Sequence, residues 1–196
     1  MKLSILATVV VVGLLVPGLA TAGVSATSSV DFGTGEFEGY WCYTIDFTWD
    51  VPMDLSNISV FVGLEGLTCA CDPGIFVFPS PAGSSTGSGE DGVCSLDYVG
   101  SYLCAGDASL PPEYSDASAV RWDPSPEVCN AGVTGSGTVI VYSLLAPGDA
   151  SEIHPGSISV KSGQNTYVGD ITGALPQADC TVHGEHQSLG SLKARF

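Results

Sequence analysis

Two cysteines stand one residue apart in residues 66–74, which read GLTCACDPG. Cys69 and Cys71 could form a metal clip, a redox pair, or the anchors of two separate disulfides. A redox site is typically C-x-x-C in a βαβ setting, and a metal site needs further ligands, whereas only Asp72 adjoins this pair. Side chains at i and i+2 of an extended chain do not bridge each other easily. We therefore expect separate partners, with Cys69 or Cys71 bonded to Cys94 and the other bonded to a distant strand or unpaired.

The remaining cysteines support the same interpretation. An exported chain meets an oxidising compartment, where disulfides persist, and an odd number leaves at least one thiol without a partner. At most three bridges can form, and spacing alone does not define which. The seven disulfide candidates are Cys42, Cys69, Cys71, Cys94, Cys104, Cys129 and Cys180.

Two further motifs contain residues used in catalysis or metal binding. Cys180, His183 and His186 have ligand types and spacing suited to zinc or copper, but Gly184 disfavours a rigid turn and an exported cysteine is more often bridged. Residues 83–92 read GSSTGSGEDG, which contains both G-x-S-x-G around Ser85 and G-x-G-x-x-G. Both motifs need a strand before them and a helix after them. A flexible loop is predicted here instead, so we assign no catalytic residue and no metal or cofactor ligand.

Acidic residues gather in three places along the chain. Carboxylate-rich loops can hold calcium, and a close pair of carboxylates can hydrolyse a glycosidic bond. No D-x-[DN]-x-[DN]-G loop is present, so solvated loops are the expectation for most of these side chains. We assign no cofactor, keep a structural calcium as an option, and keep a secreted carboxylate-dependent hydrolase as an alternative function. The groups are Glu36 and Glu38; Asp46, Asp50 and Asp54; and Asp107, Glu113 and Asp116.

Three tryptophans could form a sugar-binding platform, because aromatic rings stack on apolar sugar faces. Trp41 and Trp49 belong to an alternating apolar set and are expected in the core. Trp122 lies between Arg121 and Asp123 at the end of a predicted strand and is the better candidate for an exposed ring, although core packing remains the commoner fate of a large aromatic side chain.

The elements that must position these residues are strands. Residues 40–49, YWCYTIDFTW, alternate large apolar with small or polar side chains, and Ile58, Val60, Val62 and Leu64 continue in phase. Glycine, proline, aspartate and serine interrupt the chain about every ten residues, and loops are expected at 79–92 and 104–116. Many short strands at this spacing predict a single antiparallel β-sandwich, with a closed barrel as the rival. Further strands are expected at 74–78, 93–99, 117–123 and 137–145, with a hairpin at 156–171.

Export and charge limit the function classes. Residues 1–22 combine Lys2, an apolar stretch and a small-x-small cleavage site, which together indicate a cleaved signal peptide and no membrane span in the mature chain. The net charge of −16 disfavours nucleic acid and anionic lipid as partners. We expect a β-sandwich domain at 23–180 and a tail or docked last strand at 181–196.

The two segments YWCYTIDFTWDVPMDLSNISVFVGL and ISVKSGQNTYVGDITGALP resemble bacterial secreted modules with an immunoglobulin-like or related β-sandwich. The resemblance implies no catalytic residues. Together these observations predict a secreted, disulfide-stapled, non-catalytic module that binds a glycan or surface protein, or has a structural role, at the cell surface or outside the cell. The second alternative is a self-assembling extracellular subunit, suggested by the odd thiol and a possible edge strand.

Overall fold

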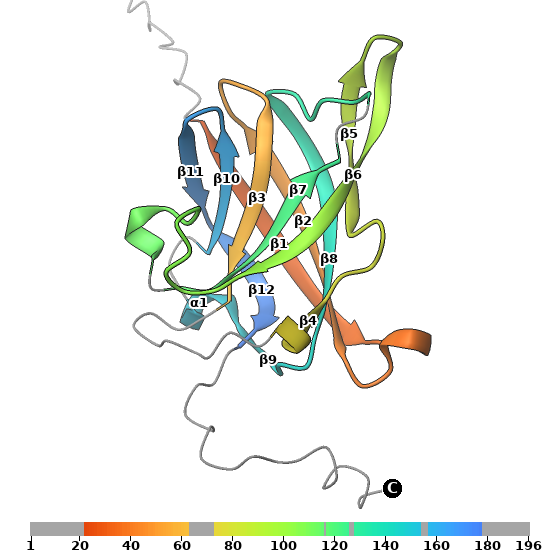
Figure 1. Ribbon diagram of the computed structural model, residues 1–196, viewed down its shortest axis with the longest axis vertical. Coiled ribbons are helices and arrows are strands. Elements are labelled where there is room, and N and C mark those ends of the chain that lie inside the picture. The colour runs from red at the N-terminus through yellow and green to blue at the C-terminus, as the bar shows by residue number, and fades with distance from the viewer. Residues whose placement is uncertain (1–21, 63–72, 116, 126–127, 154–156, 178–196) are drawn as a thin grey trace, which may run out of the picture.

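The computed structural model describes residues 22–62, 73–115, 117–125, 128–153 and 157–177 (Figure 1). Strands dominate these residues, and the helical elements are short: α1 (Ala150–Ile153) and the 3-10 turns η1 (Gly35–Phe37), η2 (Pro73–Ile75) and η3 (Pro112–Tyr114). The strands are β1 (Gly23–Phe32), β2 (Trp41–Asp50), β3 (Leu55–Phe61), β4 (Phe76–Val77), β5 (Gly83–Gly89), β6 (Gly92–Leu103), β7 (Ala119–Pro124), β8 (Thr134–Ser143), β9 (Pro147–Asp149), β10 (Ile158–Ser162), β11 (Asn165–Gly169) and β12 (Ile171–Pro176).

The strands pair without a break in the order β11-β10-β3-β7-β6-β5-β8-β2-β1-β12-β9, with β4 added against β8. Pairing is antiparallel except between β1 and β12, which run parallel. The sheet curls around its own inner face as a half-barrel (Figure 1). The predicted all-β class is therefore confirmed, whereas the predicted division into the two separate sheets of a sandwich is not clearly present.

The long strand β6 explains why two layers remain connected. Its first half, Gly92 to Asp97, pairs with β5, and its second half, Tyr98 to Leu103, pairs with β7. A strand that changes partners along its length turns a corner between layers. On the other side, the chain passes directly from β11 into β12, and the Ala26 N–H donates to the Asp170 carbonyl at 3.0 Å. One layer is thus β5-β8-β2-β1, and the facing layer is β7-β3-β10-β11.

The core fills the space between these layers. In β2 the side chains of Tyr43, Ile45, Phe47 and Trp49 are at most 3% exposed, as the alternation predicts. Across from them, β3 and β7 contribute Ile58, Val60 and Trp122, all fully buried. A smaller cluster forms where Leu110 and Tyr114 of the segment between β6 and β7 pack under Phe61.

Several predicted strands are confirmed, including those at 40–49, 93–99, 117–123 and 137–145 and the hairpin at 156–171. The segment 74–78 is shorter than expected, because only Phe76 and Val77 pair with β8. The loop predicted at 79–92 is wrong: residues 83–89 form β5 between β6 and β8. Strands β1 and β12 were not predicted. Leu64 and the predicted segments 1–22 and 181–196 lie outside the described residues, Ala22 excepted.

Candidate binding surface

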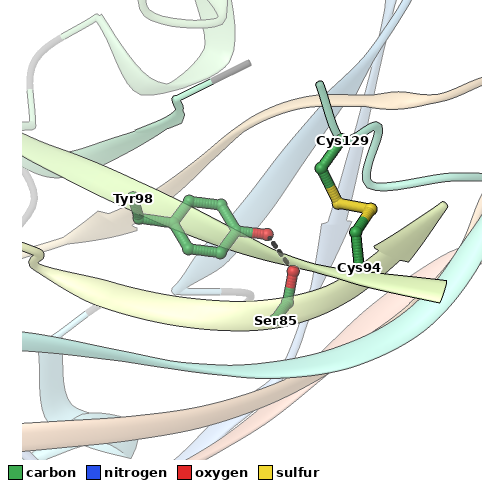
Figure 2. The surroundings of a disulfide bond; sticks show 4 residues. All are labelled: Ser85, Cys94, Tyr98 and Cys129. Carbon is green, nitrogen blue, oxygen red and sulfur yellow. Dashed lines mark hydrogen bonds between the residues drawn. A yellow bond between two sulfur atoms is a disulfide. The ribbon is translucent and has the colours of Figure 1, made fainter. Parts of the chain in front are cut away.

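Ser85 is a structural residue in β5 and does not sit in a nucleophile elbow. Its hydroxyl lies 2.9 Å from the Tyr98 hydroxyl, and both side chains are buried between the layers (Figure 2). A nucleophilic serine needs a strained strand-to-helix turn, whereas here the chain continues through a hairpin into β6. The G-x-G-x-x-G motif likewise spans the β5–β6 turn, so it lacks the helix that would hold a phosphate.

The disulfide pattern differs from the predicted one. Cys94 is bonded to Cys129, not to Cys69 or Cys71 (Figure 2). The bond ties β6 to the segment before β8, where the Ser88 and Asn130 backbones also exchange hydrogen bonds of 2.8 Å. Cys104 is also disulfide-bonded, and within the described part of the chain Cys42 is the free cysteine. Cys69, Cys71 and Cys180, together with His183 and His186, lie outside the described residues.

The tryptophans divide differently from the prediction. Trp122, the better candidate for an exposed ring, is 0% exposed, which is the commoner fate of a large aromatic side chain, and its indole N–H donates to the Ile140 carbonyl at 3.3 Å. It is buried because Arg121 and Asp123 occupy the alternate positions of β7, where they form an ion pair with each other. Trp49 is in the core, as expected. Trp41 is only partly buried, and its ring stacks on the exposed ring of Phe32.

The acidic clusters do not gather into a metal centre among the described residues, where no three Asp, Glu, His or Cys side chains come together. Asp107 instead accepts hydrogen bonds from the Ser109 hydroxyl and backbone N–H, and these lower the pKa of its carboxyl. Asp149 interacts in the same way with Ser151, whose backbone N–H and hydroxyl lower the pKa of Asp149. Asp116 lies outside the described residues.

The outer face of the layer β1-β2-β8-β5-β6 carries an ordered set of hydroxyl groups. Residues paired across neighbouring strands point to the same side of a sheet. The register therefore places five outward side chains in one row across five strands: Thr27, Asp46, Thr138, Ser84 and Asp97. Within this row the Thr138 hydroxyl donates to the Asp46 carboxylate at 2.5 Å.

A second row runs beside the first. Ser25 is paired with Thr48 and Thr48 with Ser136, while Thr86 is paired with Ser95 on the neighbouring strands. The Ser25 and Thr48 hydroxyls lie 3.0 Å apart. The sheet is hollowed here into a shallow groove of about 960 Å³ lined by residues of both rows, Asp97 excepted, and by Val93 of β6. We call this groove, with its two rows, the hydroxyl groove.

The side chains of the two rows are polar and face solvent, whereas the side chains directly beneath them are packed. Ala26, Phe47, Ser85 and Leu96 occupy the alternate positions of the same strands and are buried. Gly137 completes that inner row, and a side chain there would collide with the Ser85 Cβ and the Phe47 ring. The hydroxyl groups therefore lie on a tightly packed layer that holds their positions, because well-packed interiors resist deformation.

The outward carboxylates of this face are too far apart for glycoside hydrolysis. Asp46 and Asp97 are separated by three strand spacings, or roughly 14 Å at about 4.8 Å each. Asp46 and Asp50 lie four residues apart on one strand, or about 13 Å. Hydrolysis needs carboxyl groups about 5 to 9.5 Å apart, so neither pair fits the reaction.

The hydroxyl groove was missed by reasoning from the sequence. Several contributing segments are plain Ser/Thr alternations, such as SATSS in β1 or TGSGT in β8. The signal was the recurrence of x-S/T-x-S/T in segments that also carried small or apolar alternate residues. Only the register shows that the hydroxyl groups lie side by side.

Comparison with known proteins shows no family. No family model matches the sequence, and no characterised protein sequence matches it. Among solved structures, the second type II cohesin module from the cellulosomal adaptor ScaA scaffoldin of Acetivibrio cellulolyticus is similar over 82% of this chain and 99% of that module, at 10% identity and a TM-score of 0.22. A superposition this weak carries no argument about function. Within the described residues, no helix is long and apolar enough to cross a membrane.

Proposed function

We propose that this chain is an extracellular, non-catalytic binding module that recognises a neutral glycan through the hydroxyl groove. The observation that carries the proposal is the set of two hydroxyl rows across adjacent strands, hollowed into one groove on a packed sheet. Hydroxyl groups both donate and accept hydrogen bonds, which matches a ligand that is itself covered with hydroxyl groups.

Charge favours an uncharged ligand. Asp46 lies in the groove, and the described lining holds no lysine or arginine. An anionic polymer would meet repulsion there, in a chain whose net charge is −16. A neutral glycan meets no such repulsion, and the Asp46 carboxylate can accept a strong hydrogen bond from a sugar hydroxyl.

The extracellular part of the proposal rests on two features. Residues 1–22 have the pattern of a cleaved signal peptide. The Cys94–Cys129 disulfide suits an oxidising compartment. We retain 23–180 as the folded domain, with an arrangement related to an immunoglobulin-like β-sandwich, and 181–196 as a tail. N-terminal sequencing of exported protein should begin at Gly23.

The test is a binding screen against immobilised neutral and acidic glycans, with a basic protein as a further probe. We expect retention on a neutral glycan that changes little between low and high salt, because no ion pairs contribute. The double substitution Thr48→Val and Thr138→Val keeps side-chain shape and removes two hydroxyl groups, so affinity should fall about tenfold.

Thr166→Val is the matched control, because Thr166 is an exposed hydroxyl on β11 in the other layer. It should bind like the wild type. If only the basic protein is retained, or if the control and the groove variant lose affinity equally, the groove is not a glycan site.

A further inference from the structure

The end of the β1–β2 hairpin, residues 31–41, exposes an aromatic ring that has structural support beneath it. Phe32 is 70% exposed at the end of β1. Its ring stacks on Trp41 with centroids 4.0 Å apart and planes 29° apart. Trp41 in turn packs against the main core. A single exposed apolar side chain is common on a protein surface, so what distinguishes Phe32 is the partly buried aromatic ring that supports it.

The hairpin end is held in one shape. The Gly33 N–H donates to the Tyr40 carbonyl at 2.8 Å, and the Phe37 N–H donates to the Thr34 carbonyl at 3.2 Å. A side chain at Gly33 would collide with the Phe37 carbonyl, so the turn packs tightly upon itself. Preorganised groups bind more tightly because less conformational entropy is lost.

A second stack fixes the same turn from the outer side of the sheet. Phe37 lies on Tyr142 with ring centroids 3.8 Å apart and planes 7° apart. Tyr142 is paired with Cys42 on β2, so η1 is pinned to the sheet next to the place where β2 begins. Phe32 is therefore presented by a turn that is anchored on both sides.

Charge and size limit what Phe32 can contact. Asp31, Glu36 and Glu38 are exposed in this segment, and it contains no lysine or arginine, so anionic sugars and anionic lipid are disfavoured. Two aromatic side chains offer at most about 500 Å², less than the roughly 600 Å² that each partner contributes to even a small specific protein interface. A single sugar ring, which has an apolar face and a hydroxyl rim, fits a platform of this size.

We propose that Phe32, supported by Trp41, is a stacking platform for a neutral pyranose ring of the glycan. This inference rests on the proposed glycan-binding function and adds a second contact site to it. The turn between β1 and β2 lies at the end of the molecule opposite the β5–β6 hairpin tip (Figure 1). Its role is apolar stacking, whereas the hydroxyl groove supplies hydrogen bonds.

Tryptophan fluorescence tests the platform directly, because the other two tryptophans are buried. Trp49 is 3% exposed and Trp122 is 0% exposed, so acrylamide quenching of the native protein reports mainly on Trp41. Adding soluble neutral β-1,4-glucan or β-1,4-mannan should reduce that quenching. The reduction should disappear in Trp41→Phe, which keeps an aromatic ring but removes the reporter.

Affinity electrophoresis in gels containing the same two polysaccharides measures the energetic contribution. Phe32→Ala should weaken binding by about three- to tenfold, and Phe32→Tyr should preserve it. Val128→Ala is the matched control, because Val128 is 84% exposed and lies beside the β5–β6 hairpin. Thermal unfolding of each variant checks that the fold is retained.

The outcomes separate the two proposals. If Phe32→Ala binds like the wild type while the groove variant Thr48→Val and Thr138→Val loses binding, the platform is refuted and the glycan-binding function stands. If neither polysaccharide retards the wild type or changes its quenching, both are refuted. If Phe32→Ala instead abolishes a concentration-dependent dimer in sedimentation, Phe32 is a self-association surface and the platform is refuted.

Discussion

Alternate residues of strand β2 point to opposite faces of the sheet, and the two faces differ in burial and polarity. Its inner side chains, Tyr43, Ile45, Phe47 and Trp49, are at most 3% exposed. Its outer side chains at Asp46 and Thr48 are exposed and polar and belong to the hydroxyl groove. The large core side chains of β2 are all on one face, so residues of the other face can be polar without loss of core packing.

Substituting adjacent residues of β2 should produce the largest contrast. Phe47→Ala removes a core ring and should lower the free energy of unfolding by about 3–5 kcal/mol, because transfer free energy is lost and a cavity remains. Thr48→Ala should change it by no more than about 0.5 kcal/mol, since its side chain is exposed. Urea denaturation of both variants measures the difference. Equal losses would mean that the outer face also stabilises the fold.

The cysteines offer the next contrast, between a bonded pair and a free thiol. Replacing both Cys94 and Cys129 with serine opens a loop with a sequence separation of 35 residues and should cost about 3–4 kcal/mol. Cys42→Ser removes no disulfide and should have a much smaller effect. Thermal unfolding without reductant measures both. A large loss in Cys42→Ser would show that the thiol contributes packing that its partial exposure does not suggest.

Neighbouring serines on β5 extend the comparison of faces to a second strand. Ser85→Ala should cost about 1–2 kcal/mol, because the buried Tyr98 hydroxyl loses its 2.9 Å partner. Ser84→Ala, one residue away on the outer face, should leave stability within about 0.5 kcal/mol of the wild type. Chemical denaturation at neutral pH is the measurement. The two serines would exchange effects if the register of β5 were shifted by one residue.

The inner face of β2 could be predicted from the sequence because large apolar residues alternate without interruption. The same reasoning failed for β5, GSSTGSG, whose residues favour loops. Tertiary packing overrides that preference. A side chain at Gly87 would collide with the Asn130 backbone and the Cys129 sulfur, so this strand needs glycine to approach the disulfide-bonded segment.

The candidate site was harder to predict than the core because strand pairing, and not the local sequence, brings its residues together. Hydroxyl residues carry no signal of their own until register places Thr138 beside Asp46 and Ser84. Trp122 was the better candidate for an exposed ring because charged residues flank it, but in a strand the neighbours point the opposite way, and Trp122 is buried. The exposed ring belongs to Phe32, which no alternation singled out.

The phenol groups of Tyr43 and Tyr98, on the inner face, should make the free energy of unfolding decrease at alkaline pH. The decrease should be small between pH 9 and 10. Burial raises the pKa of Tyr98, an increase that its hydrogen bond with Ser85 only partly offsets, and burial also raises the pKa of Tyr43. Because the folded-state pKa values lie above the ordinary value of about 10, this contribution is fully present below pH 10. It is lost as pH rises through the folded-state values.

Each such tyrosine can weaken folding by at most about 1.4 kcal/mol per pH unit above 10. Tyr98→Phe should therefore show a shallower decline in the urea midpoint between pH 9 and 11 than the wild type, although it is less stable at neutral pH. Thr48→Val, which alters only the outer face, should decline in parallel with the wild type. Parallel slopes for Tyr98→Phe and the wild type would mean that Tyr98 ionises in the folded protein as readily as in the unfolded chain, and that the inner face is open to solvent at this point.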